Sequence, residues 1–137
     1  MRIMLDSNVL ISAALFRSPS INELMEFIFD NHTLVLASSV IDEVKGVVGY
    51  KFLHRQSDID AYFEAINYEL VVTDGIDDSY IIIRDNDDRK VIASALKAEV
   101  DVLITGDSDF FERDYAGIQI LTPRKFLNKF ANKELNS

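Results

Sequence analysis

The sequence has 137 residues with 48% hydrophobic composition, which predicts a single domain over residues 1–137 with one sizeable core. It contains no cysteine, so a disulfide framework and a thiolate metal site are both excluded. The formal net charge of −9 repels phosphate backbones and argues against nonspecific nucleic-acid binding, unless local positive charge or bound cations intervene.

The first half of the sequence alternates strand patterns with helical ones. Residues 2–5 predict a short buried strand, and Asp6 interrupts this apolar run too early for a signal peptide or a membrane span. We therefore expect a cytoplasmic protein. Ser20 followed by Glu23 forms a capping-box pattern that predicts a helix start. The other elements predicted in this half are a helix over 8–15, a strand over 34–36, a helix over 39–48 and a helix that begins at Ser57.

The second half continues the alternation and defines the fold class. Its predicted elements are a strand over 69–72, a polar loop that contains 80–83, a helix over 88–98, strands over 102–104 and 119–121, and a last helix that ends near 130. Thr122 followed by Pro123 is a helix cap with proline in the first turn. Strands rich in Ile, Leu and Val between helices predict a three-layer α/β/α sandwich with a central parallel sheet.

Acidic residues follow two of the predicted strands. Asp6 ends the first strand and precedes Ser7 and Asn8, and Asp107 and Asp109 come shortly after the fourth strand. In parallel sheets, ligands bind beyond the carboxyl ends of the strands. Taken singly, each acid could simply cap the helix that follows. A cap, however, does not require a second acid at a neighbouring strand.

Two predicted helices supply further acids. In the helix over 39–48, Glu43 borders the apolar arc and can reach the sheet edge, whereas Asp42 points to the opposite side. The simpler alternative is that Glu43 is a surface residue paired with a cation such as Lys45.

The helix over 88–98 carries a third acid at its start. Asp88 stands one turn ahead of the buried face and should point inward, where the helix dipole favours a negative charge. Asp85 and Asp87 point elsewhere, and a capping cluster is their simplest role.

If Asp6, Glu43, Asp88 and Asp107 converge in the fold, the repulsion between their negative charges must be compensated. Two like charges about 4 Å apart repel by roughly 4 kcal/mol at an effective dielectric near 20. Such acids must share protons or bind cations. Oxygen ligands without cysteine, and with no histidine near these positions, favour Mg²⁺ or Mn²⁺ over zinc.

These residues, in this order, resemble the motifs of the PIN-domain family of nucleases. The matching segments are Asp6-Ser7-Asn8, Glu43, the Asp-Arg-Lys-Val-Ile-Ala run at 88–93 and the Thr-Gly-Asp-Ser-Asp-Phe run at 105–110. The resemblance spans nearly the whole chain. It implies that Asp6, Glu43, Asp88 and Asp107 are both catalytic and metal-binding, and that Asn8, Thr105 and Asp109 support them. Asp87 and Asp109 could also take the roles of Asp88 and Asp107.

The resemblance implies a metal-dependent endoribonuclease that hydrolyses RNA phosphodiester bonds. One metal would activate water, and a second would stabilise the leaving oxygen. Many single-domain members are toxins of bacterial toxin–antitoxin pairs, so an antitoxin partner with a basic segment and a homodimer are expected. Tyr50 and Phe52 are interleaved with cations that we interpret as an RNA-facing rim, although an ordinary solvated loop is the alternative. These cations are Lys45, Lys51, His54 and Arg55.

Two other functions compete with this interpretation. Phosphatases with an Asp nucleophile place an acid after the first strand, but they typically carry a second Asp two residues later, where this sequence has Asn8. A catalytically silent PIN-like module could instead use its acids to bind a basic protein partner. Nucleotide binding through a glycine-rich loop is disfavoured, because the five glycines form neither a P-loop nor a dinucleotide motif.

Overall fold

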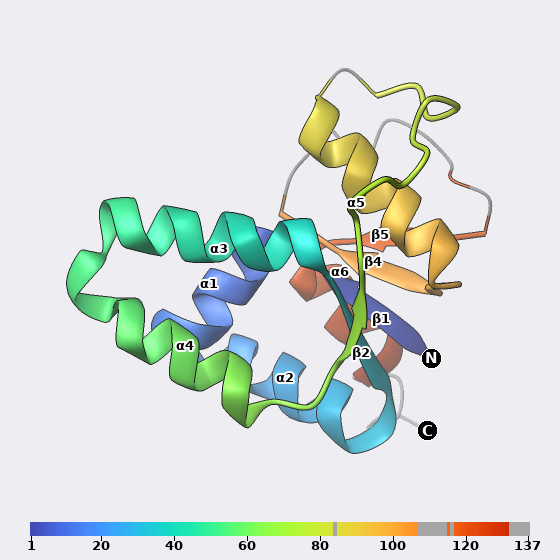
Figure 1. The fold of residues 1–137 in the computed structure, drawn as a ribbon. Coiled ribbons are helices and arrows are strands. Elements are labelled where there is room, and N and C mark those ends of the chain that lie inside the picture. The colour runs from blue at the N-terminus through green and yellow to red at the C-terminus, as the bar shows by residue number, and fades with distance from the viewer. Residues whose placement is uncertain (84, 107–114, 116, 132–137) are drawn as a thin grey trace.

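The computed structural model describes residues 1–83, 85–106, 115 and 117–131 (Figure 1). Strands and helices alternate along the chain, as the periodicity predicts. In chain order the elements are β1 (Arg2–Leu5), α1 (Ser7–Leu15), α2 (Pro19–Asn31), β2 (Thr33–Ala37), α3 (Ser38–Lys51), the 3₁₀ turn η1 (Leu53–Arg55), α4 (Gln56–Ala65), β3 (Glu69–Val71), α5 (Asn86–Lys97), β4 (Val102–Ile104), β5 (Gln119–Leu121), α6 (Pro123–Phe126) and the π-helical turn η3 (Leu127–Ala131).

In the described part of the chain, five strands form one sheet in the order β3-β2-β1-β4-β5, and every pair is parallel. Met4 of the central strand is in register with Val35 of β2 and Leu103 of β4. The chain moves outward from β1 to β3 and then crosses back to β4 on the other side. The strand order therefore reverses beside β1, and such a switch point is where parallel sheets bind ligands.

Helices cover both faces of this sheet. α5 packs on β2 from one side, and α2 and α6, which contact each other, lie on the opposite side (Figure 1). α1, α3 and α4 pack against one another and extend to the left of the sheet in Figure 1. The predicted α/β/α sandwich with a central parallel sheet is confirmed.

The core lies on both sides of β1. Ile3, Met4 and Leu5 are fully buried, and so are Val102, Leu103 and Ile104 of β4. This two-sided burial explains why these strands are continuous apolar runs instead of alternating ones. Among the helices of the described residues, none combines the length and apolarity needed to cross a bilayer.

The start of α2 corrects one prediction. Ser18, not Ser20, caps the helix, and its Oγ accepts a hydrogen bond from the Ile21 backbone N–H at 3.3 Å. Pro19 follows in the first turn, where its missing N–H costs no hydrogen bond. The capping-box prediction at Ser20 and Glu23 was therefore wrong by two residues. At the other end of the chain, the predicted Thr122 cap with Pro123 in the first turn is confirmed.

Candidate functional site

Asp6 is fixed where β1 meets α1. Its backbone N–H donates to the Ile104 carbonyl at 3.1 Å, which extends the pairing of β1 with β4 by one residue. Its side chain is buried, with 7% of the residue exposed. Oδ1 accepts from the Ser7 backbone N–H at 2.7 Å, and Oδ2 accepts from the Thr105 hydroxyl at 2.8 Å. Asp6 thus caps α1 and is also held by the neighbouring strand end.

Glu43 comes toward Asp6 from α3. Val40, Ile41 and Val44 are buried, and Asp42 is exposed as predicted. Glu43 is exposed as a whole residue, yet partial burial of its carboxyl raises its pKa above the ordinary value. The negative charges of Asp6, Asp87 and Asp85 raise this pKa further, and a hydrogen bond with the Ser7 side chain opposes them. Carboxyl groups from three separate segments therefore act on one another here.

The first turn of α5 carries the remaining described acids. Asp85 caps the helix, because its Oδ1 accepts from the backbone N–H groups of Asp87 at 2.8 Å and Asp88 at 3.2 Å. This capping role was the simpler prediction for Asp85. Asp88 is half-buried and Asp87 is exposed, which agrees with the predicted inward direction of Asp88. Asp87 and Asp85 both lie close enough to Glu43 to influence its charge.

Ser7 connects two acids of the site. Ser7 is 5% exposed, and it links Asp6 through its backbone N–H to Glu43 through its side chain. Asn8 is exposed, and its side chain makes no hydrogen bond with the described residues. The resemblance implied a supporting role for Asn8 and none for Ser7. The rotation of the first turn of α1, which the sequence does not specify, decides which of them reaches Glu43.

A second hydroxyl pair positions α3 and was not predicted. The Ser38 hydroxyl donates to Thr73 Oγ1 at 3.0 Å, and the Thr73 backbone N–H donates to Ser38 Oγ at 2.8 Å. Thr73 Oγ1 also accepts from the Ser39 backbone N–H at 3.1 Å, which stabilises a helix start that lacks a side-chain cap. Because Thr73 follows β3, these bonds fix the helix that carries Glu43 to the end of another strand.

The donor set suits a hard divalent cation, but the described residues do not complete a cage. Every acid of the site offers carboxylate oxygen. Burial, and then the charges of the neighbouring acids, raise the pKa of Glu43, and a bound cation would offset the repulsion between these acids. Among the described residues, no three acidic or histidine side chains are grouped closely enough to hold one metal ion. The predicted ligands Asp107 and Asp109 lie outside the described residues.

The predicted RNA-facing cations lie in the second half of α3 and in the η1 turn that follows it. Lys45 pairs with Asp60 at 3.9 Å and lies 5.9 Å from the centre of the Phe63 ring, so it is directed toward α4. Arg55 pairs with Asp58 at 2.6 Å. Lys51 and His54 are exposed. The rim therefore contains two cations without acidic partners in the described part of the chain, and two that are already paired.

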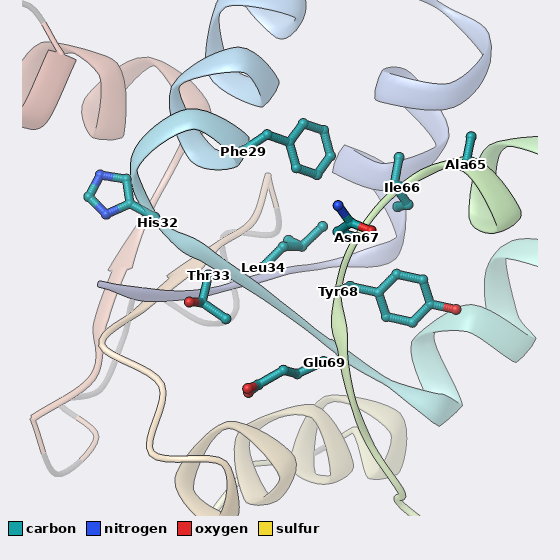
Figure 2. A pocket seen from close by; sticks show the side chains of 9 residues that line it. All are labelled: Phe29, His32, Thr33, Leu34, Ala65, Ile66, Asn67, Tyr68 and Glu69. Carbon is teal, nitrogen blue, oxygen red and sulfur yellow. The ribbon is translucent and has the colours of Figure 1, made fainter.

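A hollow of about 470 Å³ lies at the opposite edge of the sheet (Figure 2). It is bordered by the amino ends of β2 and β3, the end of α2 and the segment after α4. Phe29 points toward Asn67 and Ile66 in Figure 2, whereas the rings of His32 and Tyr68 point away from Phe29. Glu69 in this lining is paired with Arg2 at 2.6 Å. The hollow is therefore separate from the acids, which lie beyond the carboxyl ends of the strands.

The fold and the site define a parallel α/β sandwich with acidic side chains at the switch point of its sheet. The family model described as PIN domain matches residues 2–109, so the chain belongs to the PIN-domain family. It is similar to a solved structure titled "Crystal structure of VapBC2 from Rickettsia felis bound to a DNA fragment from their promoter", with a TM-score of 0.69 and 18% identity over 88% of this chain and 98% of that chain. None of the curated proteins matches the sequence.

Proposed function

We propose that the protein is a Mg²⁺- or Mn²⁺-dependent endoribonuclease that hydrolyses RNA phosphodiester bonds. The observation that carries this proposal is the proximity of Asp6 and Glu43 at the carboxyl edge of the sheet, where burial and then the charge of Asp6 raise the pKa of Glu43. Membership of the PIN-domain family, whose members are generally nucleases, supports it. We also propose that residues 1–137 form one domain and that the protein acts in the cytoplasm.

Asp6, Glu43, Asp88 and Asp107 would hold the metal, and the supporting residues would be Asn8, Thr105 and Asp109. A bound divalent ion would lower the pKa of a water molecule and offset charge on the phosphate. The protein itself orients the first ligand, because the Ser7 N–H and the Thr105 hydroxyl each fix one oxygen of Asp6. It also brings Glu43 to the same edge, through the hydrogen bonds between Ser38 and Thr73.

The net charge of −9 on the protein repels the phosphate backbone of an RNA substrate. Cations bound by the acids would reduce the repulsion locally, and Lys51 and His54 offer exposed positive or titratable groups beyond α3. Tyr50, which is 88% exposed, provides a ring on which a base can stack. Lys45 and Arg55 complete this proposed rim.

We also propose that the protein is the toxin of a toxin–antitoxin pair. The similar solved structure is of a VapBC2 complex, and the likeness covers nearly all of that chain. An acidic edge would attract a basic segment of an antitoxin. We also propose a homodimer on the basis of the family resemblance.

The structure offers less support for a phosphatase with an Asp nucleophile. Both oxygens of Asp6 accept hydrogen bonds, and the residue two positions later is the exposed Asn8. A catalytically silent binding module would use the same acids to bind a partner and would not cleave RNA. A cleavage assay therefore distinguishes it from the nuclease.

The test is cleavage of a mixed RNA pool by the purified protein with Mn²⁺ or Mg²⁺, compared with EDTA. Asp6→Asn and Glu43→Gln should each lower the rate by about 100-fold or more, because each removes a metal-directed carboxylate. Asp42→Asn is the matched control on the exposed side of α3 and should cleave as the wild type does. Equal cleavage by Asp6→Asn, or metal-independent cleavage, would contradict the proposal.

A further inference from the structure

A hollow of about 530 Å³ lies between the end of α1 and one face of α4. Its lining includes Leu15, Arg17, Arg55, Asp58 and Tyr62. Two guanidinium groups and a phenol hydroxyl therefore line one concave surface of a strongly acidic protein. We call this hollow the Arg17 pocket.

Only one of the two arginines is neutralised. Arg55 Nε lies 2.6 Å from Asp58 Oδ2, whereas Arg17 has no acidic partner within ion-pair distance among the described residues. Arg17 nevertheless acts on Tyr62: its charge lowers the pKa of the phenol, against the larger effect of burial, which raises it. The pocket thus combines an unneutralised guanidinium with a hydroxyl donor, a combination that suits an oxyanion.

The Arg17 pocket lies at the far end of the helix that begins at the acidic site. α1 has nine residues, which corresponds to roughly 13 Å at 1.5 Å per residue. An extended RNA strand crosses such a distance within a few nucleotides. Phe16, which is 51% exposed, precedes Arg17 and packs edge-on against Phe52 with ring centroids 5.3 Å apart. Arg55 lines the pocket and also belongs to the proposed rim, so the two surfaces adjoin.

We propose that the Arg17 pocket binds a backbone phosphate of the RNA strand a few nucleotides away from the bond that is cut. This inference rests on the proposed function and extends it to a second contact with the substrate. A guanidinium matches a phosphate through two parallel hydrogen bonds. The exposed Phe16 ring beside it favours a nucleic-acid strand over an acidic protein segment, because a base can stack there.

The test measures binding without cleavage. A fluorescent, mixed-sequence RNA of roughly 12 nucleotides is titrated with the full protein in EDTA at several salt concentrations. Arg17→Gln should weaken binding and reduce the slope of log affinity against log salt by about 0.7 to 1, the value of one lost phosphate contact. Lys97→Gln, which removes an equal charge from the exposed end of α5, should leave both unchanged. Arg17→Lys should keep the slope and lose part of the affinity.

Three outcomes would overturn the assignment. The first is equal slopes for the wild type and Arg17→Gln, and the second is no RNA binding by the wild type at any salt concentration. The third is displacement of the RNA from the wild type, but not from Arg17→Gln, by an oligoglutamate peptide, which would assign the pocket to an acidic peptide. If the Arg17-dependent slope is found but Mn²⁺ produces no cleavage, the pocket stands and the nuclease proposal fails.

Discussion

Asp6 carries two structural roles besides its proposed contact with metal. It caps α1, and its second oxygen accepts the Thr105 hydroxyl across the gap between β1 and β4. Because each oxygen of the carboxylate accepts its own hydrogen bond, the Asp6 side chain is held in one orientation without a bound metal ion. Such fixed ligands lower the cost of ordering a metal site.

We predict that Thr105→Val lowers the free energy of unfolding by about 1–3 kcal/mol, because the fully buried hydroxyl is lost from a buried carboxylate. Urea denaturation in EDTA measures this change, and RNA cleavage should decrease in parallel. Thr105→Ser retains the donor and is the control. A loss in Thr105→Ser with none in Thr105→Val would mean that packing of the methyl group, not the hydrogen bond, accounts for the contribution of Thr105.

Glu43 gives a prediction with a defined pH dependence. Burial of its carboxyl and the charge of Asp6 raise its pKa in the folded state, so the folded state binds the proton more tightly than the unfolded state does. This stabilising contribution is present at low pH and is lost as the pH rises through the raised pKa. Without metal, ionised Glu43 is therefore destabilising at neutral pH.

Glu43→Gln should consequently raise the melting temperature at pH 7 in EDTA, and the gain should vanish below its ordinary pKa of 4.5. Thermal unfolding monitored by circular dichroism at several pH values measures it. Asp42→Asn is the exposed control and should show no comparable gain. A lower melting temperature for Glu43→Gln at pH 7 would contradict the electrostatic account.

At the scale of elements, helix starts determine where the acids are. α1 starts with Asp6 as its cap, and α5 starts with Asp85 as its cap. α3 has no side-chain cap and is fixed instead by Thr73 from the end of β3. A carboxylate at a cap accepts hydrogen bonds from the first N–H groups of the helix, and the same bonds fix its orientation.

Substitutions at the start of α2 test whether Ser18 or Ser20 caps this helix. Ser18→Ala should destabilise the protein by about 1 kcal/mol, because Ser18 accepts the Ile21 N–H. Ser20→Ala should have little effect, since its hydroxyl contacts only the Ser18 hydroxyl, at 3.2 Å, among the described residues. Denaturant midpoints of the two variants give the comparison. A larger loss for Ser20→Ala would restore the capping-box interpretation.

At the scale of the whole molecule, the charge distribution predicts that divalent ions stabilise the fold. A net charge of −9 and several acids at one sheet edge favour any state that binds a cation. Mg²⁺ or Mn²⁺ at 100 times its dissociation constant should add about 2.7 kcal/mol to the free energy of unfolding.

Thermal unfolding of the wild type and of Asp6→Asn, each with Mg²⁺ and with EDTA, tests this prediction. The wild type should gain stability from the ion, and the variant should gain much less. NaCl at matched ionic strength controls for general screening. An equal gain in NaCl would attribute the effect to net charge and not to a site.

The sequence by itself determined the parallel α/β class, most element positions and the identity of the acids at strand ends. The continuous apolar run at 102–104 matches β4, because a strand that is buried on both faces carries apolar residues at successive positions. β5 at 119–121 begins with the exposed Gln119 and is only half-buried. Asp6 and Glu43 could be predicted as site residues from local patterns too. Asp6 directly follows an apolar strand, and Glu43 borders the apolar face of a helix.

Only the tertiary structure decided the contacts between distant segments. The bond from Thr105 to Asp6 spans 99 positions and the bond from Ser38 to Thr73 spans 35, and no local periodicity encodes such pairs. The hydrogen bond of Ser7 with Glu43, the start of α2 at Ser18 and the Arg17 pocket all depend on how elements rotate against their neighbours. That rotation is set by packing of the whole core, to which each residue contributes only a small part.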